Sequence, residues 1–110
     1  MNDDISSALE AMVRRIKQQA EEGIQEVAMD LLQKSKDLCP VDLGDLKASG
    51  FISKEGDKTV VGYTEPYALR QHEELEFNHP NGGQAKFLQQ PLEENTDKYI
   101  RHVVDKIKLT

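Results

Sequence analysis

The feature that most constrains this chain is a row of apolar residues near its start. Its members recur at steps of three, four or seven positions, which is the period of an α-helix face and not of a strand. They are Ile5, Leu9, Val13, Ile16, Ala20, Ile24, Val27, Leu31 and Leu38. We therefore predict one amphipathic helix over residues 5–38, about 50 Å long at about 1.5 Å per residue.

Residues at both ends of this stripe fit helix boundaries. Asn2 is the predicted N-cap, and the acidic pair that follows it suits the positive end of the helix dipole. Cys39-Pro40 predicts the end, because proline disfavours helix in the residue before it. The stripe follows about 3.6 residues per turn and not 3.5, so we expect the helix to pack on the chain's own sheet and not to form a coiled coil.

The next segment predicts a short helix and then a β-hairpin. Residues 41–50 resemble a turn followed by a helix that Asp42 could cap. Residues 51–54 and 59–63 are short β-type runs on either side of a Gly-containing and Asp-containing turn over residues 55–58.

The last third of the chain predicts a second helical region. A short helix over residues 67–73 and an exposed, polar loop over residues 74–84 follow the hairpin. Pro91 is then expected at the first position of a final helix of four to five turns. Its apolar stripe consists of Leu92, Tyr99, Ile100, Val103 and Ile107.

These elements predict one α+β domain spanning residues 1–110. A long N-terminal helix and a C-terminal helix would pack on a small antiparallel sheet containing the hairpin. A chain of 110 residues falls within the usual size of a single domain. A domain this small buries a limited share of its surface, which favours an assembly subunit.

Charge and cysteine content argue against several functional classes. The formal net charge of −6 opposes nonspecific attraction to nucleic acid or to an anionic membrane. Apolar runs are too short for a membrane span, and we expect no membrane partner. The single Cys39 has no intramolecular disulfide partner, which fits a reducing compartment.

Asp42, Gly44, Leu46 and Ser49 follow the long helix with the spacing Asp-x-Gly-x-Leu-x-x-Ser, and two further motifs follow the hairpin, over residues 66–73 and 82–92. These three segments resemble the tail-component (tail-completion, minor capsid) family of long-tailed bacteriophages. The first covers residues 39–49 and is similar to the family's Pro-x-Asp-Thr-Gly-x-Leu-x-x-Ser signature after the long helix. Asp42, Gly44, Leu46 and Ser49 match this signature, whereas Leu43 replaces the usual threonine. Physically, the glycine permits a tight turn, the leucine suits a core position and the serine suits the end of the short helix.

The other two segments follow the hairpin in the family's order. Tyr67, Ala68 and Glu73 resemble the family's Tyr-Ala-x-x-x-x-Glu stretch, with Glu74 in place of the usual glycine. The third segment resembles the point where the family's loop returns to the body before the final helix. Its residues are Gly82, Gly83, Ala85, Phe87 and Leu88, followed by Pro91 and Leu92.

The resemblance implies a structural, non-enzymatic protein without a cofactor, metal or small-molecule substrate. Subunits of that family form a ring at the head–tail junction, between the capsid connector and the tail tube, and DNA passes through the ring without specific binding. The implied partners are other copies of this chain and the connector and tail-tube proteins. The implied location is the virion of a phage or prophage, assembled in the bacterial host cytoplasm.

The remaining motifs give only weak evidence for a metal site, a catalytic cysteine or a phosphate-binding loop. His72, His79 and the glutamates between them carry metal-ligating groups but lack the spacing of a metalloprotease motif. Cys39 with His72 or His102 as base is a conceivable nucleophile, although a lone cysteine before proline is more typical of a buried apolar position. The Gly82-Gly83 pair lacks the Gly-Lys-Ser/Thr ending of a phosphate loop.

Two alternatives to the ring subunit remain open on the residues alone. A small helical binding or regulatory module, monomeric or dimeric, would use the long N-terminal helix to dock a partner. A small metal-dependent hydrolase would need bound metal in the purified protein.

Overall fold

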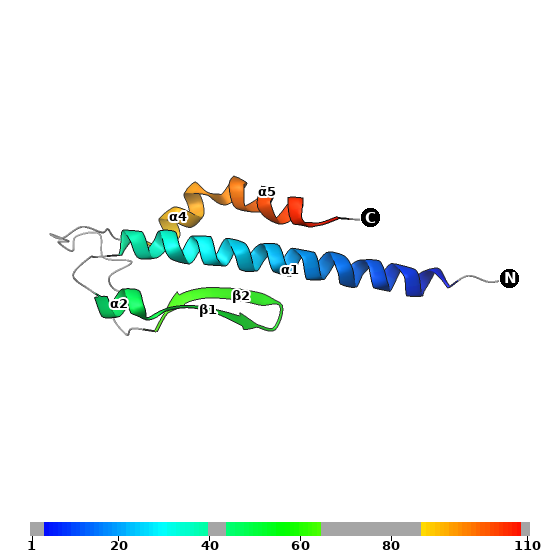
Figure 1. Cartoon of the computed structure of the whole chain (residues 1–110), viewed down its shortest axis with the longest axis horizontal. Helices are drawn as coiled ribbons and strands as arrows, with labels where there is room; N and C mark the ends of the chain where they lie inside the picture. Colours follow the sequence, from blue (N-terminus) through cyan, green and yellow to red (C-terminus); the bar gives the residue numbers. More distant parts are fainter. Residues whose placement is uncertain (1–3, 40–43, 65–86, 109–110) are drawn as a thin grey trace.

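The computed structural model describes residues 4–39, 44–64 and 87–108, together with their side chains except those of residues 44 and 45. The helices are α1 (Ile5–Leu38), α2 (Gly44–Ala48), α4 (Gln89–Glu94) and α5 (Thr96–Lys106), and the strands are β1 (Gly50–Glu55) and β2 (Lys58–Tyr63). The predicted α+β class is confirmed, with helix predominating over one small antiparallel sheet (Figure 1). The predicted helix over residues 67–73 and the loop over residues 74–84 lie outside the described residues.

Helix α1 has the predicted bounds but a different cap. The Asp4 carboxylate accepts a hydrogen bond from the Ser7 backbone N–H at 3.3 Å, so Asp4, not Asn2, is the N-cap. Cys39 ends the helix and its backbone N–H bonds the carbonyls of Ser35 and Lys36. The predicted stop before Pro40 is therefore confirmed.

The predicted hairpin is confirmed with slightly longer strands. β1 and β2 pair antiparallel in a register that sets Gly50 opposite Tyr63 and Glu55 opposite Lys58. This register leaves a two-residue turn at 56–57, in which Gly56 has a φ of 62°. Glycine adopts this left-handed conformation without the steric cost that a Cβ would bring.

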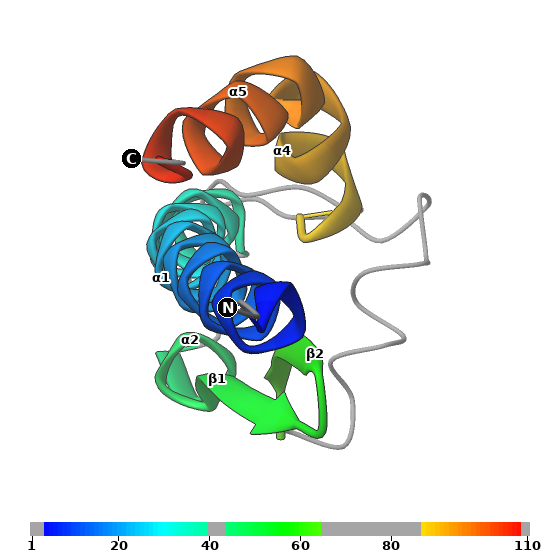
Figure 2. The same cartoon turned by 90° about the vertical axis from the view of Figure 1, so that its right-hand side faces the viewer.

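Helix α1 lies between two layers, the hairpin and the pair of C-terminal helices. The hairpin packs on one side of α1, and α4 and α5 pack on the opposite side (Figure 2). Gly23 permits the close approach of α5, because a Cβ at this position would lie 3.2 Å from Val103 Cα and Lys106 Cγ. The long helix is thus the central element of the fold.

A cluster of almost fully buried apolar side chains lies at the C-terminal end of α1. Cys39, Leu46 and Phe87 are each at most 1% exposed, and Leu38 and Tyr63 pack against them. The rings of Tyr63 and Phe87 meet edge to face, with centroids 5.4 Å apart. This cluster joins α1, α2, β2 and the residue that leads into α4.

Our prediction of a single C-terminal helix is wrong, because the chain forms two helices that meet at Asn95. The Asn95 side-chain N–H donates to the Pro91 carbonyl at 2.7 Å, and the Thr96 hydroxyl donates to the Leu92 carbonyl at 2.8 Å. Such side chains compete with the backbone ladder and interrupt helices. Pro91 is accordingly the third residue of α4, not the first of a longer helix, and it is buried.

The expectation that the whole apolar stripe packs on the chain's own sheet is also wrong for its N-terminal part. Ile5 is 69% exposed, Leu9 54% and Val13 61%, whereas Leu31 is 7% exposed. Strands of six residues extend about 20 Å and the eleven residues of α5 about 16 Å, whereas α1 extends about 50 Å. The covering elements are too short to reach the first turns of α1.

Candidate functional site

The residues that carry the family resemblance divide into buried, partly buried and undescribed positions. Leu46 and Phe87, from the first and third segments, meet in the buried cluster with Cys39. Ser49 follows α2, and its hydroxyl donates to the Leu46 carbonyl at 2.8 Å. Gly44 is the first residue of α2, and the half-buried Leu88 precedes α4. Asp42, Tyr67, Ala68, Glu73, Gly82, Gly83 and Ala85 lie outside the described residues.

A small polar group sits at the edge of the buried cluster. The hydroxyls of Ser35 and Tyr63 are 2.7 Å apart, and the Cys39 thiol donates to the Tyr63 hydroxyl at 3.5 Å. Burial raises the pKa of the Cys39 thiol and that of the Tyr63 phenol above their ordinary values. Both groups therefore stay neutral and satisfy one another, so this arrangement favours packing over nucleophilic chemistry.

The structure separates Cys39 from His102, one of the two histidines that we considered as its base. His102 lies on α5, with its Nε2 2.6 Å from a Glu26 carboxylate oxygen. Glu26 and Cys39 are thirteen residues apart along α1, which corresponds to about 20 Å. Cys39 and His102 therefore do not form a catalytic pair. His72 and His79 lie outside the described residues.

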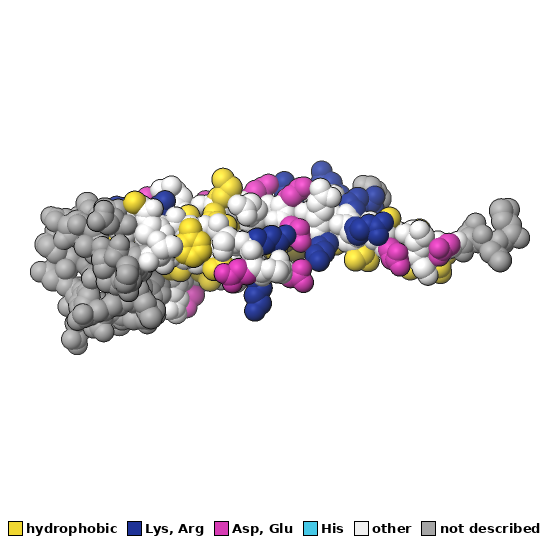
Figure 3. Space-filling model, turned by 90° about the horizontal axis from the view of Figure 1, so that it is seen from below, with side chains coloured by type: hydrophobic (Ala, Val, Ile, Leu, Met, Phe, Trp, Pro, Cys, Tyr) yellow, Lys and Arg dark blue, Asp and Glu magenta, His cyan; other side chains and the backbone are white. Residues whose placement is uncertain are grey.

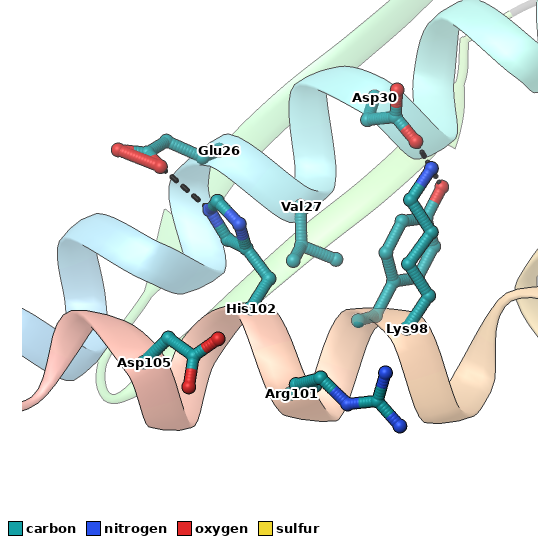
Figure 4. A pocket seen from close by; sticks show the side chains of 8 residues that line it. Glu26, Val27, Asp30, Lys98, Arg101, His102 and Asp105 are labelled. Carbon is teal, nitrogen blue, oxygen red and sulfur yellow. Dashed lines mark hydrogen bonds and ion pairs between the residues drawn. The ribbon is translucent and has the colours of Figure 1, made fainter.

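A pocket lined mainly by polar side chains lies between α1 and α5. It is a cavity of about 360 Å³ lined by Glu26, Val27, Asp30, Lys98, Tyr99, Arg101, His102 and Asp105 (Figure 4). Two groups of bonds close it at either end. Glu26 accepts from Lys106 at 2.8 Å as well as contacting His102, and Asp30 accepts from the Tyr99 hydroxyl at 2.6 Å and pairs with Lys34.

Electrostatics at this cavity favour fixed ion pairs and not an acid–base couple. The Lys106 ammonium, together with His102, lowers the pKa of the Glu26 carboxyl, and Lys34, together with the Tyr99 hydroxyl, lowers that of Asp30. Burial and the nearby Asp30 carboxylate raise the pKa of Tyr99. A general acid or base at neutral pH needs a pKa moved toward 7, whereas these shifts move away from it. The site therefore acts as a clamp that holds α5 on α1.

The described residues show neither a cluster of metal ligands nor a helix that could span a membrane. Within residues 4–39, 44–64 and 87–108, no three His, Cys, Asp or Glu side chains come together as a metal site. No helix in this same part of the chain combines the length and apolar character that crossing a bilayer requires.

An apolar groove lies on the side of α1 where β2 and α4 approach each other. It encloses about 280 Å³ and is lined by Ile24, Val27, Ala28, Leu31, Thr59, Val61, Leu88 and Leu92. Two of these side chains form its exposed edges, since Ile24 is 38% and Leu92 45% exposed. A groove of this composition suits the apolar face of a helix better than a polar small molecule.

Sequence reasoning missed both the groove and the clamp. The clamp unites Asp30 with Tyr99 and Glu26 with His102, which are 69 and 76 positions apart along the chain. No local pattern signals such pairs. The groove has a partial signal, because its floor belongs to the apolar stripe of α1 and Leu92 belongs to the predicted C-terminal stripe.

Comparisons of the chain with protein-family models, with curated proteins and with solved structures give no match.

Proposed function

We propose that this chain is a structural subunit of a phage or prophage particle that joins the head connector to the tail tube. It would act by protein–protein contact in a ring of identical subunits, through which DNA passes without specific binding. The proposal begins from the three family-like segments at residues 39–49, 66–73 and 82–92.

The observation that carries the proposal is the convergence of two of these segments. Leu46 belongs to the first segment and Phe87 to the third, and both are buried against Cys39 at the end of α1. Residues that match a family motif because of packing are expected to meet in the core, as these do. The order of long helix, short helix and hairpin also agrees with the resemblance.

The chemistry of the described residues supports a contact-based role. Its buried polar groups satisfy one another, and its ion pairs hold α5 to α1. The net charge of −6 would also suit a surface along which DNA slides without sticking.

Deletion of the gene from its phage or prophage, followed by electron microscopy of the particles, tests the proposal. We expect DNA-filled heads and complete tails that lie apart, and a plasmid copy of the gene should restore joined particles. Intact, infectious particles in the deletion strain would contradict the proposal.

A matched pair of variants tests whether particle joining requires the folded domain. Phe87→Ala removes a buried ring and is expected to cost about 3–5 kcal/mol of stability, so complementation should fail. The same truncation at exposed Leu92 should leave the core folded, as circular dichroism would show. Complementation by the folded variant but not by the unfolded one ties particle joining to this domain.

A second candidate function is supported by the exposed N-terminal part of α1. A helical binding or regulatory module would present Ile5, Leu9 and Val13 to a partner groove, in a helix-in-groove contact. Neighbouring genes discriminate the two candidates, since portal, capsid and tail-tube genes beside this one favour the particle subunit.

A further inference from the structure

The first three turns of α1 form a projecting segment, residues 5–16, that no other described element covers. Just after it, α1 is bonded to both neighbouring layers, through the Lys17–Asp57 ion pair to the hairpin turn and the bond from the Lys108 backbone N–H to Gln19. Figure 3 shows hydrophobic side chains on this part of the molecule beside Lys and Arg side chains. The exposed large apolar residues of the segment are Ile5, Leu9, Met12 and Val13.

The projecting segment and the apolar groove lie on the same face of one helix. Val13 and Leu31 are eighteen residues apart, which is five full turns at about 3.6 residues per turn, so their side chains leave α1 in the same direction. Leu9 and Val27 are related in the same way. The face runs from Ile5 to Leu31 without a charged member in the stripe, over about 40 Å.

One chain cannot bring these two surfaces together. Both belong to the continuous helix α1, and a straight helix does not fold back on itself. A second copy can, because the face is self-complementary. When two α1 helices meet antiparallel about a two-fold axis near residue 18, Leu9 of each lies beside the partner's Val27, and both projecting segments reach the partner's groove at once.

We infer that two copies of this chain associate antiparallel through α1, with the projecting segment of each lying in the apolar groove of the other. The contact buries Leu9 and Val13 of one copy against the exposed edges of the other, the partner's Ile24 and the partner's Leu92. The inference does not depend on the proposed role in particle joining, and it concerns the free protein in solution.

The size of the contact predicts a dimer that dissociates on dilution. Each projecting segment offers about 18 Å of helix, so the two reciprocal contacts approach the roughly 1,200 Å² that separates weak from stable complexes. We therefore expect a dissociation constant on the order of 10 µM, and sedimentation equilibrium between about 1 µM and 500 µM should show conversion from monomer to dimer. A protein that stays monomeric across this range would overturn the inference.

Substitutions on the face test which surfaces meet. Leu9→Glu in the projecting segment and Leu92→Glu at the groove edge should each raise the dissociation constant by about 100-fold, because two-fold symmetry introduces each change twice. Both side chains are exposed in the single chain, so circular dichroism of the dilute variants should match that of the parent. Ala11→Glu on the opposite side of α1 is the matched control and should leave the constant unchanged. Dimerisation of either face variant at the parental constant contradicts the contact.

A distance measurement tests the antiparallel arrangement. Spin labels on Ser7→Cys of both copies should lie about 40 Å apart in the proposed dimer but about 25 Å or less in a parallel one. Cys39 is fully buried, so labelling of the folded protein is directed to position 7. A short distance, or one that is unchanged by Leu9→Glu, refutes the reciprocal docking. Loss of dimer without any effect on particle assembly would leave the proposed function standing, and the reverse result would leave the dimer standing.

Discussion

The apolar stripe runs along both halves of α1, but the rest of the chain covers it only in the C-terminal half. In the C-terminal half, Ala28, Leu31 and Ser35 are buried between the hairpin on one side and α4 and α5 on the other. In the N-terminal half, Ile5, Leu9 and Val13 project beyond both layers. Periodicity in sequence thus identifies the face of a helix that seeks apolar contact, while the lengths of the other elements decide how much of that face the same chain can cover.

The largest expected difference between the two halves of α1 is in the stability lost when one negative charge is placed in each half. Leu31→Asp puts an unpaired carboxylate at a side chain that is 7% exposed, and we expect a loss of about 4 kcal/mol of unfolding free energy. Leu9→Asp at a 54% exposed position should cost less than about 0.5 kcal/mol.

Urea titration at about 1 µM, below the proposed dimer constant, measures both values for the monomer. Equal losses at positions 31 and 9 would mean that the projecting segment is packed within the single chain.

A medium effect concerns the close approach of α5 to the middle of α1. A Cβ added at Gly23 would lie only 3.2 Å from Val103 Cα and Lys106 Cγ, so the larger side chain of Gly23→Leu must push α5 outward. The expected net cost is about 2 kcal/mol, since overpacking outweighs the gain of about 1 kcal/mol in helix propensity.

Ala11→Leu in the projecting segment is the control and should change thermal stability by less than a degree or two, because position 11 is exposed. A Gly23→Leu protein as stable as the parent would show that α5 is not held against α1 at this point.

The smallest effect is the pH dependence of the clamp between α1 and α5. Glu26 and Asp30 have lowered pKa values in the folded protein, so their contribution is fully present above the unfolded values of about 4 and is lost as the pH falls through the folded values. We expect the melting temperature to be level from pH 7 to about pH 5 and to decline below that range.

Glu26→Gln tests the assignment, since it removes the carboxylate that accepts from Lys106. The gap in melting temperature between parent and variant should be largest near neutral pH and should close as the pH falls through the lowered pKa of Glu26, where the parent carboxyl becomes protonated as well. A gap of constant size across this range would rule out the ion pair as its source.

Local patterns predicted the regular elements of the described residues closely. The stripe and Cys39-Pro40 defined α1 at Ile5–Leu38, and Gly56 with Asp57 identified the hairpin turn. These signals succeed because caps, turns and helix faces depend on residues within a few positions of one another. The break at Asn95 was missed because local sequence does not decide what an asparagine side chain does. It can point away from a continuing helix, or it can bond to a backbone carbonyl of the preceding turn and interrupt the helix, as it does here.

The sequence by itself determined that this chain makes a long amphipathic helix, a hairpin and C-terminal helical structure. Only the tertiary structure decided which half of the long helix is covered, that Asp30 meets Tyr99 and Glu26 meets Lys106, and that an apolar groove opens between β2 and α4. The physical reason is the separation along the chain over which each kind of interaction acts. Helix and turn formation respond to neighbours along the chain, whereas burial and ion pairing depend on which distant segments are long enough, and close enough, to meet.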